Sequence, residues 1–275
     1  MKIVVLAGGL STERDVSFKT GEMVTKALRE NGHQVILLDV FMGYSDKEED
    51  LTGIFDRAEA VSVKVAAIPE TAPDLEKVKA QRKDQSDNFF GPNVIELCRM
   101  ADIVFMALHG ENGENGKIQA AFDLFGIRYT GTGYLGSALA MNKGMAKQLF
   151  LENGIPTPRG TSLKRGEDAA KIETCGIHFP CVVKPCSGGS SIGVSIVHDK
   201  AEYEQALKEA FRWENELVIE EYVKGREFSV GVIEGKALPV IEIAPSSIFR
   251  RFRSSRSRRW KASMIIRTNT KREVR

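Results

Sequence analysis

The sequence predicts an α/β protein in which a domain with a parallel sheet comes first, a second domain follows, and an incomplete C-terminal α+β domain ends the fold. Three observations carry this prediction. Apolar runs alternate with helical stretches in residues 1–132, short strands with glycine turns dominate residues 216–243, and 42% of the 275 residues are hydrophobic. A chain of this composition buries substantial cores.

The first element is an apolar run at residues 3–7, which ends in a glycine pair and is typical of a buried strand entering a tight turn. Ser11 and Thr12 are placed to cap a helix that runs to about Asn31. A second strand follows at residues 34–40. A strand, a helix and a strand in this order favour a parallel pair.

The remainder of the first half continues this pattern. Residues 43–92 are rich in charge and are predicted to form a peripheral insertion. We expect a strand at residues 101–108, a helix at 117–125 and a short strand at 128–130. One continuous helix is expected over residues 135–153, before a stretch with two prolines.

Alternating strands characterise the second half. Asp199 is expected to cap a helix that ends near Trp213. The predicted strands are residues 181–184, 194–198, 216–222, 227–233 and 237–243. Together the elements divide the chain into residues 1–132, 133–223, 224–245 and a basic tail, 246–275.

Charge and cysteine content exclude several classes of protein. Residues 246–275 carry nine Arg and two Lys against one acid, so the rest of the chain is acidic although the net charge is +2. No nucleic-acid module accompanies this tail, and we expect no nucleic-acid partner. The four cysteines have no metal-ligand spacing, and no apolar stretch reaches membrane length, so we expect reduced thiols in a cytoplasmic protein with no membrane contact.

A glycine- and serine-rich loop is the clearest chemical feature. Lys184 ends a predicted strand, and the loop that follows contains Gly189, Ser190 and Ser191. Glycines let backbone N–H groups approach an anion, hydroxyls add donors, and a lysine supplies positive charge for a phosphate. No Gly-Lys-Ser/Thr follows, so this is not a Walker A loop.

Acidic residues downstream are placed to bind the rest of a nucleotide. Glu220 ends a predicted strand and suits an adenine amino group, while Glu227 suits a ribose diol. Such residues most often lie on a solvated face, and so does a helical lysine such as Lys143. Each of these residues indicates nucleotide binding only in combination with the glycine- and serine-rich loop.

A second group lies at the carboxyl edge of the predicted parallel sheet, where open sheets bind ligands. His109 begins a glycine-rich loop after one strand, and Glu13 follows the first strand. A carboxylate and an imidazole there suit the ammonium and carboxylate of an amino acid. Residues 131–136 match GxGxxG, but no second strand with a terminal acid follows, so we reject dinucleotide binding.

Taken together, the motifs resemble the D-alanine–D-alanine ligases, a family of the ATP-grasp superfamily. The matching segments are GGLSTERDVS (8–17), LHGENGENGKIQ (108–119), YTGTGYLGSALAMNK (129–143), VVKPCSGGSSIGVS (182–195) and IEEYVKGREFSVGV (219–232). The resemblance implies an ATP-grasp central domain and ATP-dependent ligation of two D-alanines through an acyl phosphate, for peptidoglycan synthesis. It also implies a homodimer and an Mg²⁺ or Mn²⁺ requirement.

Roles for individual residues follow from the resemblance. Glu13 is implied to bind the ammonium of the first D-alanine, with His109 close by, and Ser190 to pair with Glu13 in catalysis. Lys143, Lys184 and the loop residues Gly189, Ser190 and Ser191 are implied to contact the ATP phosphates. Adenine and ribose are implied to be held by Glu220, Tyr222, Val223 and Glu227.

The resemblance stops after Pro245. The family's catalytic arginine and acidic metal ligands are not recognisable, since only Glu273 follows Glu242 among the acids. Read two bases later with permitted codons, residues 260–275 can give EGFYDYKNKYKAGST, which is similar to the family's mobile loop. We therefore predict a frameshift between Pro245 and Trp260 and little ligase activity for the chain as written.

Alternative functions remain open from the sequence. A ligase that makes D-alanyl-D-lactate or D-alanyl-D-serine is the nearest one, and another ATP-grasp carboxylate–amine ligase is more distant. The Arg-rich tail also allows a nucleic-acid-binding protein, whose binding would depend steeply on salt.

Overall fold

The computed structural model describes residues 1–44, 50–65, 73–187, 189 and 193–243. The chain divides into two compact units, Met1–Glu221 and Tyr222–Arg275. Among the described residues, no helix has both the length and the apolar character needed to cross a membrane.

A parallel three-stranded sheet organises the N-terminal region, as expected. Its strands are β1 (Lys2–Ala7), β2 (Gln34–Asp39) and β3 (Ile103–Met106), in the order β2-β1-β3. The strand expected at residues 101–108 is therefore shorter than predicted, and residues 128–130 contribute only an isolated bridge to β3.

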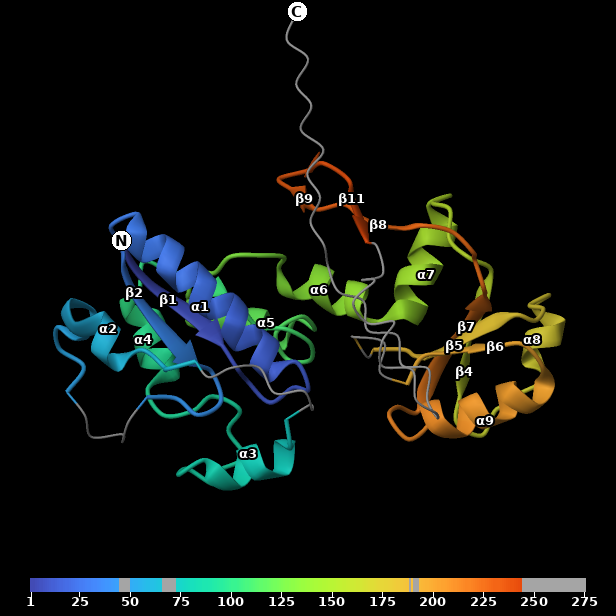
Figure 1. The fold of residues 1–275 in the computed structure, drawn as a ribbon, viewed down its shortest axis with the longest axis horizontal. Helices are drawn as coiled ribbons and strands as arrows, with labels where there is room; N and C mark the ends of the chain where they lie inside the picture. Colours follow the sequence, from blue (N-terminus) through green and yellow to red (C-terminus); the bar gives the residue numbers. More distant parts are fainter. Residues whose placement is uncertain (45–49, 66–72, 188, 190–192, 244–275) are drawn as a thin grey trace, which may run out of the picture. The chain divides into compact units, whose positions relative to one another are not determined.

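Helices cover both faces of this sheet (Figure 1). Val5 and Leu37 pack on one face against α1, while Leu6 and Ile36 pack on the other against α4 and α5. The helical elements of this region are α1 (Arg14–Glu30), η1 (Ile54–Arg57), α2 (Ala58–Val61), α3 (Leu75–Gln81), α4 (Val94–Met100) and α5 (Lys117–Phe125).

Two expectations for this region are wrong. Residues 43–92 are not merely peripheral, because Ile54, Phe55 and Ala58 are buried in the core beside the sheet. Helix α1 begins at Arg14, so the side chains of Ser11 and Thr12 do not cap it. The Ser11 hydroxyl instead accepts a bond from the Glu13 amide at 3.0 Å.

An antiparallel four-stranded sheet organises the following region, in the order β4-β7-β5-β6. Strand β4 has one fully buried side chain, Leu163. The sequence has no apolar run that would predict this strand. The elements are α6 (Tyr134–Met141), α7 (Lys143–Glu152), β4 (Gly160–Lys164), α8 (Lys171–Thr174), β5 (Cys181–Pro185), β6 (Ser195–Val197), α9 (Lys200–Ala210) and β7 (Glu216–Glu221).

The two faces of this sheet differ in character. Leu163, Val183, Leu217 and Ile219 lie on an apolar face that α8 and α9 cover. Side chains alternate between the faces of a strand. Lys184 and Glu220 therefore belong to the opposite face, against which α7 packs. The candidate site is built on this polar face.

The expected helix over residues 135–153 is broken at Asn142. The side chain of Asn142 accepts a bond from the Met145 amide at 2.9 Å and caps α7. The amide of Lys143 donates to the carbonyl of Cys186 at 2.9 Å instead of continuing α6. The break thus ties the start of α7 to the end of β5.

The second unit contains two small antiparallel sheets, β11-β8 and β10-β9. Two of the expected strands are each split in two, giving β8 (Glu227–Ser229), β9 (Val232–Ile233), β10 (Lys236–Ala237) and β11 (Ile241–Ile243). Nearly all side chains in these strands are exposed. Residues 244–275, including the basic tail, lie outside the described part of the chain.

Candidate active site

A largely buried cluster of two lysines and one glutamate lies on the polar face of the central sheet. Lys184 on β5 forms an ion pair with Glu220 on β7, through Nζ and Oε1. Lys147 on α7 reaches the other carboxylate oxygen, Oε2, at 3.0 Å. Three elements therefore converge on one carboxylate.

The environment of Glu220 keeps its carboxylate ionised. Burial disfavours the charge, but the hydrogen bonds and positive charges of Lys184 and Lys147 outweigh burial and lower the pKa of Glu220. An acceptor held in this form suits an amino group of a ligand.

This lowered pKa predicts a pH-dependent contribution to stability. Ionised Glu220 stabilises the fold fully above its ordinary pKa of 4.5, and this contribution is lost as the pH falls through the lower folded-state value. The difference in unfolding free energy between the wild type and Glu220→Gln should therefore shrink as the pH falls below 4.5. Urea titrations at pH 7 and at several acidic pH values measure it; a difference that stays constant with pH contradicts the prediction.

Lys143 lies next to this cluster, at the first position of α7. Its Nζ donates to the carbonyl of Cys186 at 3.3 Å. Burial lowers the pKa of Lys143, and the nearby positive charge of Lys184 adds to this effect against the opposing charge of Glu214. The two lysines that the sequence assigned to phosphate binding are therefore close enough to interact.

The glycine- and serine-rich loop begins directly after β5. The amide of Ser187 donates to both oxygens of Glu214, at 2.8 and 3.1 Å. Gly193 has φ +70°, and a Cβ there would lie 2.8 Å from Pro185, so a larger residue is excluded. Ser190 and Ser191 lie outside the described residues.

The N-terminal group forms where the loops after β1 and β3 meet. The hydroxyl of Ser11 donates to the carbonyl of His109 at 2.9 Å, and the His109 Nε2 contacts the Thr20 hydroxyl at 2.9 Å. A Cβ on Gly110 would lie 2.7 Å from Glu13 Oε2. Glu13 and the loop that His109 begins are thus adjacent, as the sequence predicted from the sheet edge.

Two further observations concern Glu13. A Cβ built on Gly189 would lie 3.5 Å from Glu13 Oε2. Arg14, the next residue, forms a buried ion pair with Asp39 and also donates to the carbonyl of Gly9. The loop that carries Glu13 is therefore anchored to the end of β2.

Three residues of the predicted nucleotide site belong to the second unit and are described only within it. Tyr222 and Val223 are exposed, and Glu227 starts β8, where it pairs with Ile243. Their proposed contacts with adenine and ribose stay predictions.

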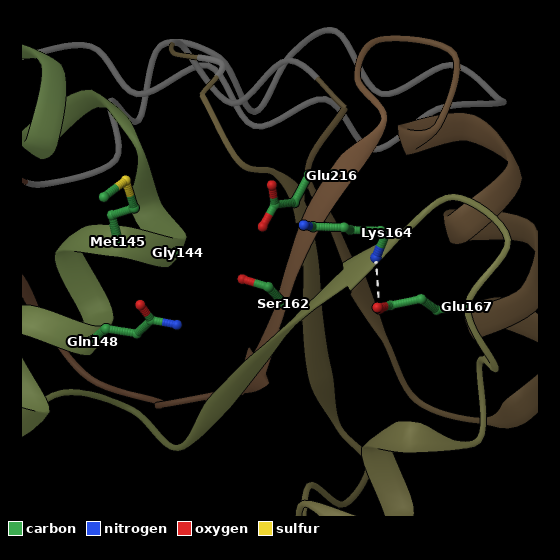
Figure 2. A pocket seen from close by; sticks show the side chains of 7 residues that line it. All are labelled: Gly144, Met145, Gln148, Ser162, Lys164, Glu167 and Glu216. Carbon is green, nitrogen blue, oxygen red and sulfur yellow. Dashed lines mark hydrogen bonds between the residues drawn. The ribbon is translucent and has the colours of Figure 1, made fainter.

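A cavity of about 330 Å³ lies on the polar face, at the other end of the strands (Figure 2). No residue assigned from the sequence lines it, although Gly144 follows Lys143. The lining residues are Gly144, Met145, Gln148, Ser162, Lys164, Glu167 and Glu216.

Comparison with models of protein families identifies the family of this chain. A family model described as the D-ala D-ala ligase N-terminus matches residues 2–132. A model described as the D-ala D-ala ligase C-terminus matches residues 149–275, a range that includes the basic tail. The chain belongs to the D-alanine–D-alanine ligase family.

Individual members of the D-alanine–D-alanine ligase family agree with this result. The chain is 46% identical over 243 residues to a D-alanine--D-alanine ligase of Lacticaseibacillus casei, covering 88% of this chain and 67% of the relative. It is 44% identical over 253 residues to one of Pediococcus pentosaceus, covering 88% and 68%. The chain thus spans about two thirds of the length of these relatives.

Solved ligase structures share the ATP-grasp fold. The structure of D-alanine--D-alanine ligase from Bacillus anthracis complexed with ATP matches at a TM-score of 0.65 and 30% identity, covering 90% of this chain and 68% of that one. A D-Ala:D-Ser ligase from Enterococcus faecalis matches at 0.62 and 28%, covering 90% and 71%.

Sequence reasoning missed three residues of the site. Lys147 resembled a solvated helical lysine, yet it is only 7% exposed. Arg14 and Asp39 carried no motif that paired them. An arginine directly after Glu13 was the one available signal, since buried arginines need a partner.

Proposed function

We propose that the chain is an ATP-dependent ligase that joins two D-alanines to D-alanyl-D-alanine for peptidoglycan synthesis. The observation that carries the proposal is the Lys184–Glu220 pair beside Lys143, at the start of the glycine- and serine-rich loop. Two ammonium groups and a fixed acceptor suit the phosphates and the adenine of one nucleotide. Membership of the family and the similarity to a ligase complexed with ATP support it.

The proposed reaction has two steps. The carboxylate oxygen of the first D-alanine attacks the γ-phosphorus of ATP, and ADP leaves. The amine of the second D-alanine attacks the carbonyl carbon of the acyl phosphate, loses a proton, and phosphate leaves. Such chemistry depends mainly on positioning and charge neutralisation.

Each part of the site has a proposed role in these steps. Lys143 and Lys184 offset phosphate charge, and the loop with Gly189, Ser190 and Ser191 closes over the phosphates. Glu13 holds the ammonium of the first D-alanine and interacts with Ser190, with His109 near the substrate. Tyr222, Val223, Glu227 and Glu220 surround adenine and ribose.

A divalent metal, Mg²⁺ or Mn²⁺, does not fit the residues that the structure describes. Within the described ranges, no group of three or more His, Cys, Asp or Glu side chains could hold an ion. After Glu242 only Glu273 adds a carboxylate. No step is therefore assigned to a metal, and we propose that this chain by itself ligates D-alanine slowly or not at all.

Calorimetric titration with ATP tests the proposal. We expect the wild type to bind ATP and Lys184→Met to bind it at least about 30-fold more weakly, because a charge contact to phosphate is lost. Lys208→Met, which removes an exposed lysine of α9 on the opposite side of the sheet, is the control and should bind normally. A wild type that binds no ATP overturns the proposal.

Product analysis tests the reaction. The chain is incubated with ATP and D-alanine alone, with D-alanine and D-lactate, or with D-alanine and D-serine, and products are identified by mass spectrometry. We expect only D-alanyl-D-alanine, in small amounts. A mixed product alone contradicts the D-alanine assignment, and phosphate release at a rate normal for an enzyme contradicts the predicted impairment.

The proposal extends to assembly and location. We propose a homodimer in the cytoplasm, which the family resemblance implies. Light scattering after size-exclusion chromatography measures the mass directly, and a monomer at micromolar concentration contradicts the dimer.

A further inference from the structure

Lys147 is a buried ammonium group whose partners are all fixed parts of the fold. Its Nζ donates to the Thr157 hydroxyl at 3.1 Å and to the Pro158 carbonyl, and it pairs with Glu220 Oε2. Its side chain is only 8% exposed. A lysine with three protein acceptors has no donor left for a ligand.

A glycine makes this arrangement possible. Gly160 lies opposite Glu220 in the β4–β7 pairing. A Cβ on Gly160 would lie 2.9 Å from Glu220 Cβ and 3.0 Å from Lys147 Cε. The absence of a side chain lets the lysine stem cross β4 and reach the carboxylate.

Two ammonium groups therefore hold Glu220 from both ends. Lys184 binds Oε1, and Lys147 binds Oε2. With each oxygen engaged, the plane of the carboxylate has one orientation. Each oxygen has a second lone pair, and the Glu220 side chain remains 12% exposed, so a fixed acceptor stays available for a further donor.

We propose that Lys147 is a positioning residue that orients Glu220 and thereby sets the preference of this site for a purine with a 6-amino group. The inference rests on the proposed function, in which Glu220 accepts from adenine. A fixed carboxylate accepts a hydrogen bond from the amino group of ATP and repels the 6-oxo group of ITP. Without Lys147, both oxygens are free to turn toward Lys184.

Binding of ATP and ITP to the full chain tests the inference. We expect the wild type to prefer ATP, and Lys147→Met to reduce the ratio of ATP to ITP affinity by about tenfold, the value of one charged hydrogen bond. A purely structural role would weaken both nucleotides equally and leave the ratio unchanged. Lys208→Met, which removes an exposed lysine of α9 on the other side of the sheet, is the control and should keep the wild-type ratio.

Stability is controlled with a second variant. Because Lys147→Met leaves the Pro158 carbonyl without its donor, thermal unfolding is recorded, and if this variant does not fold, Lys147→Gln replaces it. Lys147→Arg, which keeps the charge, should retain part of the preference. If the wild type prefers ATP and both neutral variants keep its ratio, the positioning role is overturned while the proposed function stands. If the wild type binds neither nucleotide, both fail.

Discussion

An Arg14→Met variant is expected to lose about 3–5 kcal/mol of unfolding free energy. Arg14 and Asp39 form an ion pair whose side chains are 10% and 4% exposed. Removal of the guanidinium leaves a buried carboxylate with backbone donors alone, from Phe41 at 2.9 Å, Met42 at 3.2 Å and Gly9 at 3.4 Å. Urea unfolding at neutral pH, followed by circular dichroism, measures the loss.

A double-mutant cycle separates this pair from general damage. Asp39→Asn should also be strongly destabilising, and the double variant should lose less than the sum of the two single losses. The control on the same helix is Lys19→Met, which breaks an exposed pair with Glu22 and should cost less than about 1 kcal/mol. Additive losses would show that the two charges do not stabilise each other.

A Gly91→Ala variant is expected to lose about 3 kcal/mol of unfolding free energy. This is the upper end of the usual cost of overpacking. A Cβ on Gly91 would lie 2.4 Å from the Gly43 nitrogen and 2.6 Å from the Phe41 carbonyl oxygen. Both are backbone atoms, which cannot move aside as a flexible side chain does. Because the segment after β2 crosses Gly91 here, the added methyl must separate two chain segments.

The same substitution elsewhere is the control for the Gly91 prediction. Gly225 has no atom within 4 Å of an added Cβ and no positive φ, so Gly225→Ala should change the melting temperature little. Equal losses in the two variants would show that close backbone packing is not the cause.

Sequence patterns within a short segment predicted the elements that are held by contacts within that segment. Helix α5 has the expected bounds, and the Asp199 side chain accepts from the Glu202 amide at 2.8 Å, as expected of a cap. The parallel pairing of β1 and β2 also followed from the order of strand, helix and strand. These features depend on residues that lie near one another in the chain.

Features that depend on distant contacts could not be predicted. The helix break at Asn142 exists because Lys143 bonds to Cys186, and no pattern within residues 135–153 indicates that partner. Strand β4 is polar and gains its place by pairing with β7.

In the candidate site, too, residues within motifs were predicted, and a residue that depends on distant contacts was missed. Lys184, Glu220 and Lys143 were identified from motifs, and the structure pairs Lys184 with Glu220 and places Lys143 next to this pair. Lys147 was missed because its burial depends on Gly160 on the next strand and on Glu220, which lies far along the chain.

The division of the central sheet into an apolar and a charged face affects the register in which β7 pairs with its neighbours. A slip of β7 by one residue against its neighbours would turn Glu220 inward and Ile219 outward. The misaligned sheet would have to desolvate a carboxylate with no cation opposite it, which costs several kcal/mol. The charged side chain of β7 therefore favours the register in which Glu220 meets Lys147 and Lys184, so the pairing that buries the apolar face also brings the two lysines and the glutamate together.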